Sequence, residues 1–317
     1  MDDHRQRLRD AVQALIVHSS HAFSWFGRRN DFPAWRKLRK TIVEERLRTA
    51  VQEQLYTGFY CPGVAEPFEE PSLGDSIAAR RWKASLSLAN RGAGCLEGGW
   101  SLVERRGGVV IVRKDGLTVA AESGDWVSGR MRLPNELLDF SPGFYIALGD
   151  KPLDGGARTF RVYWNLRAAG ARSFVAEATA SLNRARVPFR LKVLDDPARY
   201  DRCDAAVLYL RTRDRTRAYG VVGTLAATLR KHLKPPTPAF AKPIAAGVAI
   251  AEQPPAGGSF GVSRTAIVAA ALVQSFRRQE TALERRMARV SAAFARDGID
   301  LERPYLNPGS RDVYPCL

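Results

Sequence analysis

Apolar and polar residues alternate with a period of two in the middle of the chain. The alternation predicts two strands whose apolar faces belong to a core. A third run is apolar throughout, as is typical of a central strand. Arg161 and Tyr163 share the polar face of the first strand, and Arg190 and Lys192 share that of the second. The pattern therefore predicts one sheet with a cationic face. Its strands span residues 159–166, 187–194 and 205–210.

Elsewhere the spacing of apolar residues predicts helices separated by short extended segments. Apolar residues three and four positions apart predict helices over residues 2–17, 33–56, 77–90, 168–186, 214–232, 259–279 and 281–296. Residues 23–29 are expected to be a connector. Turn residues between short alternating runs predict an antiparallel meander over residues 101–121, with a further strand within 125–133. A helical turn is expected over residues 135–140 and a strand over residues 144–148.

The predicted elements place the chain in the α+β class and divide it in two. An N-terminal helical region with a small antiparallel β meander is expected over residues 1–150, followed by a mixed α+β domain over residues 151–317. The boundary falls at residues 151–157, which are rich in Gly and Asp. With 317 residues, 45% of them hydrophobic, the chain has enough apolar surface for one large or two medium cores.

Composition disfavours several classes of protein. The sequence contains no run of about 18 apolar residues, the length needed to span a membrane. Its charged first ten residues do not resemble a secretory signal. A cytoplasmic location and no membrane partner are therefore expected. The four cysteines form no CxxC pair and are accompanied by only four histidines, so no metal site is predicted. The cysteines are Cys61, Cys95, Cys203 and Cys316.

Positive charge is concentrated in the middle of the chain. The formal net charge is +16, and residues 150–235 carry 18 basic and 8 acidic side chains. This excess predicts an anionic partner for the segment that also holds the cationic face. Nucleic acid is the obvious alternative. No helix-turn-helix, aromatic RNP pattern or zinc finger is present, so no nucleic-acid partner is expected.

A sheet face that brings Arg161, Tyr163 and Lys192 together is an expected anion site. Like charges repel, and a phosphate or carboxylate held by guanidinium groups relieves that repulsion. Arg264 lies in the first turns of a helix that follows a Gly-rich loop, and a helix N-terminus favours an anion. Lys242 is a further candidate ligand. The alternative is an ordinary solvated polar face.

Four of these segments resemble, in order, segments of the HopA-type effector family: FRVYWNL (160–166), VPFRLKVL (187–194), RCDAAVLY (202–209) and SFGVSR (259–264). The resemblance extends upstream through LYTGFYCPG (55–63), GGW (98–100) and PGFYIALG (142–149), and so covers most of the chain. Members of this family occur as type III effectors. In bacteria they also occur beside kinase-like proteins that make dehydrated peptides such as class V lanthipeptides and thioamitides, where the HopA-type protein is taken to be the lyase partner.

The resemblance implies a phosphoserine or phosphothreonine lyase that requires no metal or organic cofactor. A weaker similarity reaches the phosphothreonine lyase effectors, which have a Lys-x-His strand followed by a Lys-x-Lys-Val strand. In this comparison Arg161 falls at the first lysine, Lys192 at the lysine that takes the Cα proton, and Tyr163 at the general-acid histidine. Lys192 would be the base, kept neutral by burial and neighbouring cations, and Tyr163 the proton donor. The phosphate ligands would be Arg161, Arg190, Arg202 and Arg264, with Lys242 and Tyr209 as further candidates.

The partners implied by the resemblance are a phosphorylated precursor peptide and a kinase-like protein. Two alternatives use the same residues. The pocket could hold a phosphopeptide, or the leader of a precursor, without turnover, and the replacement of the expected histidine by Tyr163 favours this interpretation. The protein could instead be a type III effector that acts on a host protein.

Overall fold

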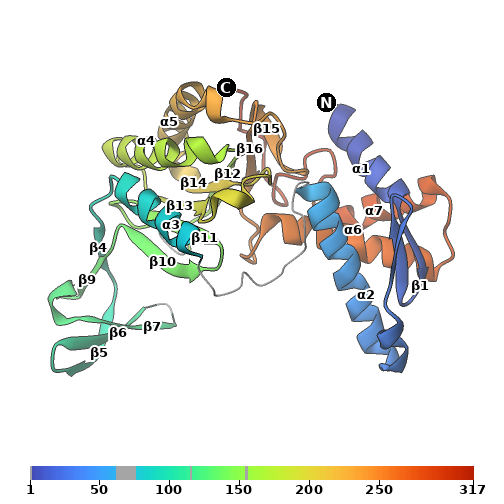
Figure 1. Ribbon diagram of the computed structural model, residues 1–317, viewed down its shortest axis with the longest axis horizontal. Coiled ribbons are helices and arrows are strands. Elements are labelled where there is room, and N and C mark those ends of the chain that lie inside the picture. The colour runs from blue at the N-terminus through green and yellow to red at the C-terminus, as the bar shows by residue number, and fades with distance from the viewer. Residues whose placement is uncertain (1, 62–75, 115, 154–155) are drawn as a thin grey trace.

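The fold is built around one antiparallel sheet of seven strands (Figure 1). The structure, a computed structural model, describes residues 2–61, 76–114, 116–153 and 156–317. Across the sheet, the strands are β10 (Glu136–Ser141), β11 (Phe144–Leu148), β13 (Phe189–Leu194), β14 (Ala206–Arg211), β12 (Thr159–Trp164), β16 (Val248–Glu252) and β15 (Lys242–Ala245). Every neighbouring pair is antiparallel, and the protein is of the α+β class, as predicted.

One face of the sheet is apolar and packs beneath helices. Alternation along β12 directs Phe160, Val162 and Trp164 to this face, and all three are fully buried. Helix α4 (Ala171–Arg184) lies over it and brings Phe174 to 5.0 Å from the Trp164 ring, measured between ring centroids. Helices α5 (Arg215–Thr228) and α3 (Ile77–Ala89) complete the layer (Figure 1). Burying these side chains leaves the cationic positions of the same strands on the other face.

A separate group of helices stands beside the polar face of the sheet (Figure 1). It consists of α1 (Asp2–Ala14), α2 (Lys40–Leu55), α6 (Phe260–Arg277) and α7 (Leu283–Arg296). The Ser259 hydroxyl caps α6 by accepting from the backbone N–H of Val262 at 3.4 Å. The first residue of α6, Phe260, lies with its ring 6.4 Å from the ring of Tyr163 on the sheet. The start of α6 thus closes part of the polar face.

The predicted meander forms small sheets that project away from the seven-stranded sheet (Figure 1). One contains β5 (Ser101–Arg106), β6 (Val109–Lys114) and β7 (Leu117–Glu122), and another contains β4 (Cys95–Gly98), β9 (Arg130–Leu133) and β8 (Trp126–Val127). They share a minor core of Trp100, Val110, Val112 and Met131. None of the helices that the structure describes is long and apolar enough to cross a membrane.

Two segments that were not predicted to be strands form strands. Residues 15–31, expected to be a helix end and a connector, form a hairpin sheet of β1 (Leu15–Ser19), β2 (Ala22–Trp25) and β3 (Arg28–Asp31). β-Branched Ile16 and Val17 suit an extended backbone once a partner strand is present. Residues 135–140, expected to be a helical turn, form edge strand β10, because pairing with β11 overrides local helix propensity.

The expected division at residue 150 stays a prediction. Strands β10 and β11 precede that residue yet belong to the seven-stranded sheet, and α2 packs against α6 from the other end of the chain. Part of the predicted boundary, residues 154 and 155, lies outside the described residues. Elements from both sides of residue 150 therefore support the polar face.

Candidate functional site

Two rungs of side chains cross the polar face, each running over β13, β14 and β12. In the first, which we call the arginine rung, Arg190, Tyr209 and Arg161 lie directly opposite one another. In the second, the lysine rung, Lys192 and Tyr163 lie opposite the same residue of β14. Residues directly opposite one another point to the same face of a sheet. The register therefore brings five of the predicted site residues onto one surface.

Tyr209 lies between two guanidinium groups of the arginine rung. Its ring centroid is 4.6 Å from Cζ of Arg190 and 5.1 Å from Cζ of Arg161. Such cation–π contacts orient a guanidinium without neutralising it. Among the described residues Arg190 has no ion pair, and its Nε is buried without a hydrogen-bond partner. The charge of Arg190 is thus held in place and available to an anion.

Arg161 is bonded only to neutral acceptors. It is 5% exposed, and its Nε donates to Gln253 Oε1 at 2.7 Å while its Nη2 donates to the carbonyl of Gly258. Gly257 and Gly258 have φ of +78° and +71°, which lets the loop after β16 turn back toward the sheet. Neutral acceptors satisfy hydrogen-bond donors but do not cancel a charge. Arg161 therefore fixes this loop and still contributes positive potential.

Lys192, like Arg190 and Arg161, has no carboxylate partner in the described part of the chain. Its Nζ donates to Ser141 Oγ at 2.9 Å and lies 4.1 Å from the centroid of the Phe144 ring. Burial, followed by the charges of Arg190 and Arg161, lowers the pKa of the Lys192 amine to about 8. About a tenth of the amine is therefore neutral at pH 7, far more than for an ordinary lysine.

Arg202 lies close enough to Lys192 to affect its pKa, but its own charge is compensated. It forms a two-pronged ion pair with Asp204, with Nε–Oδ1 and Nη2–Oδ2 distances of 2.6 and 2.9 Å. Burial disfavours the charged form, yet the pair with Asp204 raises the pKa of Arg202 above its usual value. The thiol of Cys61 donates to the same carboxylate at 3.1 Å. Arg202 therefore forms part of the structure next to the lysine rung. Because its charge is paired with Asp204, it does not fit the expected role of a free phosphate ligand.

Tyr163 lies on the lysine rung, but the structure does not bring its hydroxyl to open space. The residue is 2% exposed, and the hydroxyl has no hydrogen-bond partner among the described residues. Burial raises the pKa of the phenol to about 12. A sealed phenol with that pKa is a poor proton donor at neutral pH. The geometry therefore gives no support to Tyr163 as the general acid.

Arg264 and Lys242 are not gathered into the rungs. Arg264 is 2% exposed, and its Nε and Nη2 donate to the carbonyls of Pro304 and Leu306 at 2.8 and 3.2 Å. Burial lowers the pKa of this guanidinium to about 10. Lys242 lies on edge strand β15, where its Nζ donates to Asp312 at 2.6 Å. Both side chains fasten the C-terminal segment to the body of the protein.

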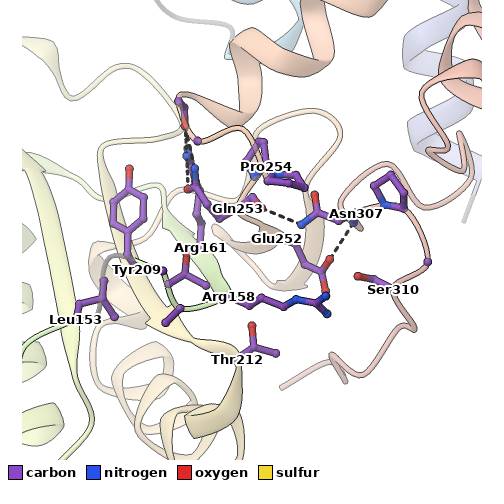
Figure 2. A pocket seen from close by; sticks show the side chains of 18 of the residues that line it. Leu153, Arg158, Arg161, Tyr209, Thr212, Glu252, Gln253, Pro254, Asn307 and Ser310 are labelled. Atoms are coloured by element: carbon purple, nitrogen blue, oxygen red, sulfur yellow. Dashed lines mark hydrogen bonds between the residues drawn. The ribbon is translucent and has the colours of Figure 1, made fainter. Parts of the chain in front are cut away.

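A cleft of about 1140 Å³ opens from the arginine rung toward the C-terminal segment (Figure 2). We call it the arginine cleft. Arg161, Arg190 and Tyr209 line its inner end, whereas Lys192 and Tyr163 do not line it. The outer part is formed by residues that sequence reasoning missed: Arg158, Thr212, Glu252, Gln253, Asn307, Ser310 and Arg311. Of these, only Arg158 could have been found from the sequence, because it precedes a predicted strand in a basic segment. The others reach the cleft through contacts between segments that are distant in the chain.

The donors around the cleft suit an anion rather than a cation. The polar side chains that line it are guanidinium, amide and hydroxyl groups, and among the described residues Glu252 is the carboxylate in the lining. Over the residues that the structure describes, no three His, Cys, Asp or Glu side chains gather in a way that could hold a metal ion. The arrangement can bind a phosphate or carboxylate, and the Lys192 amine lies one rung farther along the same face of the sheet.

Comparison with known proteins agrees with the similarity noted in the sequence. A model of the HopA1 effector protein family matches residues 136–306, which span β10 to the segment after α7. The effector protein from Pseudomonas syringae pv. tomato strain DC3000 is 15% identical, with a TM-score of 0.49 over 83% of this chain and 95% of that chain. The effector protein from Pseudomonas syringae pv. syringae strain 61 is 13% identical, with a TM-score of 0.47 over 83% and 98%. No curated protein matches.

Proposed function

The chain belongs to the HopA1 effector protein family, and from this premise we propose that it eliminates phosphate from phosphoserine or phosphothreonine in a peptide. The observation that carries the proposal is the Lys192 amine, which has no carboxylate partner among the described residues and lies on the same sheet face as Arg190. Its pKa of about 8 suits a base that must be neutral to act.

In the proposed reaction neutral Lys192 takes the Cα proton of the phosphorylated residue. The electrons of the broken Cα–H bond form a Cα–Cβ double bond, and the Cβ–O bond breaks. The products are a dehydroamino acid and inorganic phosphate: the oxygen released from Cβ takes a proton from water, and the lysine returns its own proton to water. Arg190 and Arg161 hold the phosphate during its departure and stabilise the charge that develops on it. The leaving group is thus assigned to the arginines, without a proton from Tyr163.

The substrate in this proposal is a ribosomally made precursor peptide that a kinase-like protein phosphorylates first. This part rests on the similarity of the sequence to HopA-type proteins of peptide pathways, and on the positive charge of the arginine cleft. A phosphorylated segment would enter the cleft in extended form and place its phosphate at the arginine rung. The kinase-like partner would supply that segment.

A synthetic phosphothreonine peptide tests the proposal, with loss of phosphoric acid followed by mass spectrometry. We expect turnover by the native protein and a loss of about 10²-fold or more in Lys192→Ala, as is typical when a general base is removed. Lys192→Ala should still bind the phosphopeptide through Arg190. Lys231→Ala, which removes an exposed lysine that belongs to neither rung and does not line the cleft, should behave as the native protein. Unchanged turnover in Lys192→Ala would refute the assignment of the base.

A second candidate function is phosphopeptide binding without turnover. It is favoured by the position of Lys192 outside the lining of the cleft and by the buried hydroxyl of Tyr163. In that case the native protein would bind the phosphothreonine peptide with the affinity of Lys192→Ala and release no phosphate, with or without a kinase-like partner. The same experiment therefore separates the two functions.

A further inference from the structure

The arginine cleft continues well beyond the arginine rung. Its outer part lies between the chain ends of β12 and β14 and the C-terminal segment, which contributes Asn307 and Ser310 (Figure 2). Figure 2 shows Arg161 directed toward the loop that carries Gln253, and Arg158 extending toward the segment that carries Ser310. A single phosphate at the arginine rung would leave this outer part unfilled.

Two arginines in the outer part have no side-chain partner among the described residues. In the described part of the chain, neither Arg158 nor Arg311 makes an ion pair or a side-chain hydrogen bond, and both line the cleft. The nearby carboxylates are already bound. Glu252 accepts from the Asn307 backbone N–H at 2.8 Å and the Tyr314 hydroxyl at 3.2 Å.

The carboxylate of Asp312, the residue that follows Arg311, also has hydrogen-bond partners. It accepts from Lys242 at 2.6 Å and from the Tyr305 hydroxyl at 2.8 Å. Among the residues that the structure describes, the cleft therefore presents Arg158, Arg161, Arg190 and Arg311 against one carboxylate that is already bonded, that of Glu252. Such an excess attracts a ligand with more than one negative charge.

We propose that the outer part of the arginine cleft binds carboxylate side chains of the substrate peptide, so that the protein prefers a phosphorylated residue followed or preceded by an acidic segment. The inference rests on the proposed function for the position of the phosphorylated residue. Arg158 and Arg311 are the specificity-determining residues. They act on affinity, because they lie away from the Lys192 amine and the bonds that change.

The sheet sets the spacing between the two charges on the peptide. Lys192 lies at the level of Tyr163 on β12, and Arg158 is five positions earlier in the chain than Tyr163. At about 3.3 Å per extended residue these levels are roughly 17 Å apart. A peptide bound in extended form covers that distance in about five residues. The carboxylates are therefore expected about five positions from the phosphorylated residue, and not next to it.

Fluorescence anisotropy with labelled phosphothreonine peptides tests this inference, using Lys192→Ala protein so that turnover cannot interfere. The peptides carry two glutamates about five positions before or after the phosphothreonine, the same glutamates adjacent to it, or glutamines throughout. For one of the distant placements we expect about three- to tenfold tighter binding than for the glutamine peptide. The double variant R158Q/R311Q should abolish that preference. R105Q, an exposed arginine on β5, should preserve it.

The outcomes separate the inference from the proposed function. A preference that persists in R158Q/R311Q, or its absence in the parent protein, would overturn the inference even if the native protein turns over every peptide. A preference that depends on the two arginines would support it even if no peptide loses phosphate. Tighter binding of a single-stranded oligonucleotide of equal net charge would overturn it in favour of nucleic acid. Where turnover occurs, R158Q/R311Q should raise KM for the glutamate peptide and leave kcat unchanged.

Discussion

At the centre of the polar face, Lys192 and Arg190 have no carboxylate partner among the described residues, whereas Arg202 at its rim and Lys242 on edge strand β15 are each paired with an aspartate. All four are basic residues of one sheet or its margins, and the sequence made all of them candidate site residues, Lys192 as the base and the others as phosphate ligands. They differ in whether the fold brings an aspartate within reach of the basic group. The cations that are paired hold the structure together, and the unpaired cations at the centre of the polar face can bind an anion.

The sharpest test of this comparison removes the partner of a rim cation. Asp204 is 6% exposed, and Asp204→Ala would leave buried Arg202 without its counter-charge and the Cys61 thiol without its acceptor. Breaking a buried ion pair from one side costs about 3–5 kcal/mol, so we expect a loss of that size in the free energy of unfolding in urea. Asp31→Ala breaks the exposed pair with Arg29 and should change stability little. Equal effects of the two changes would contradict the comparison.

A second test follows the central lysine with pH. Because the pKa of Lys192 is lowered to about 8, kcat/KM for a phosphothreonine peptide should rise about tenfold per pH unit up to about pH 8 and then level off. Arg190→Gln removes the largest of the charges that lower this pKa, so the curve should move to higher pH. Arg285→Gln, on the exposed side of α7, should not move it. A profile that is flat between pH 6 and 8 would contradict Lys192 as the base.

The protonation of Lys192 should also make the free energy of unfolding depend on pH. The folded pKa of about 8 lies below the ordinary value of 10.5, so between these two values the unfolded chain binds more protons at Lys192 than the folded chain does. The contribution of Lys192 to the free energy of unfolding therefore becomes more favourable as the pH rises from about 8 to about 10.5. The cost of burying this amine is felt below that window, where activity is also expected to fall.

The sequence predicted the sheet face well because alternation with period two is a local property. The positions of Arg161, Tyr163, Arg190 and Lys192 on one face required only correct strands, and the register across β14 then aligned them. The hairpin at residues 15–31 and strand β10 were missed, since each is stabilised by a partner that local propensity does not reveal.

The sequence could not predict which residues of the site are free to bind a ligand, and the reason differs from that for the missed strands. Whether a cation is paired depends on which carboxylate the fold brings to it, and Asp312 is 70 positions from Lys242 in the chain. Burial of the Tyr163 hydroxyl likewise depends on packing by the first turn of α6. The walls of the arginine cleft come from segments as distant as Arg158 and Asn307. Residue types and periodicity indicate an anion site, but only long-range packing decides which of its members are free.

The smallest expected effect concerns the tyrosine of the lysine rung. Tyr163→Phe removes a buried hydroxyl that has no partner among the described residues, so stability should stay the same or rise slightly, and turnover should change by less than about threefold. Removing a true general acid would instead lower turnover by about 10²-fold or more. Tyr209→Leu is the matched change on the arginine rung: it removes the ring between Arg190 and Arg161 and should weaken phosphopeptide binding several-fold in anisotropy measurements. If Tyr163→Phe loses more activity than Tyr209→Leu loses affinity, the hydroxyl must reach the substrate during the reaction, and the division between sealed and available groups on this face would not hold.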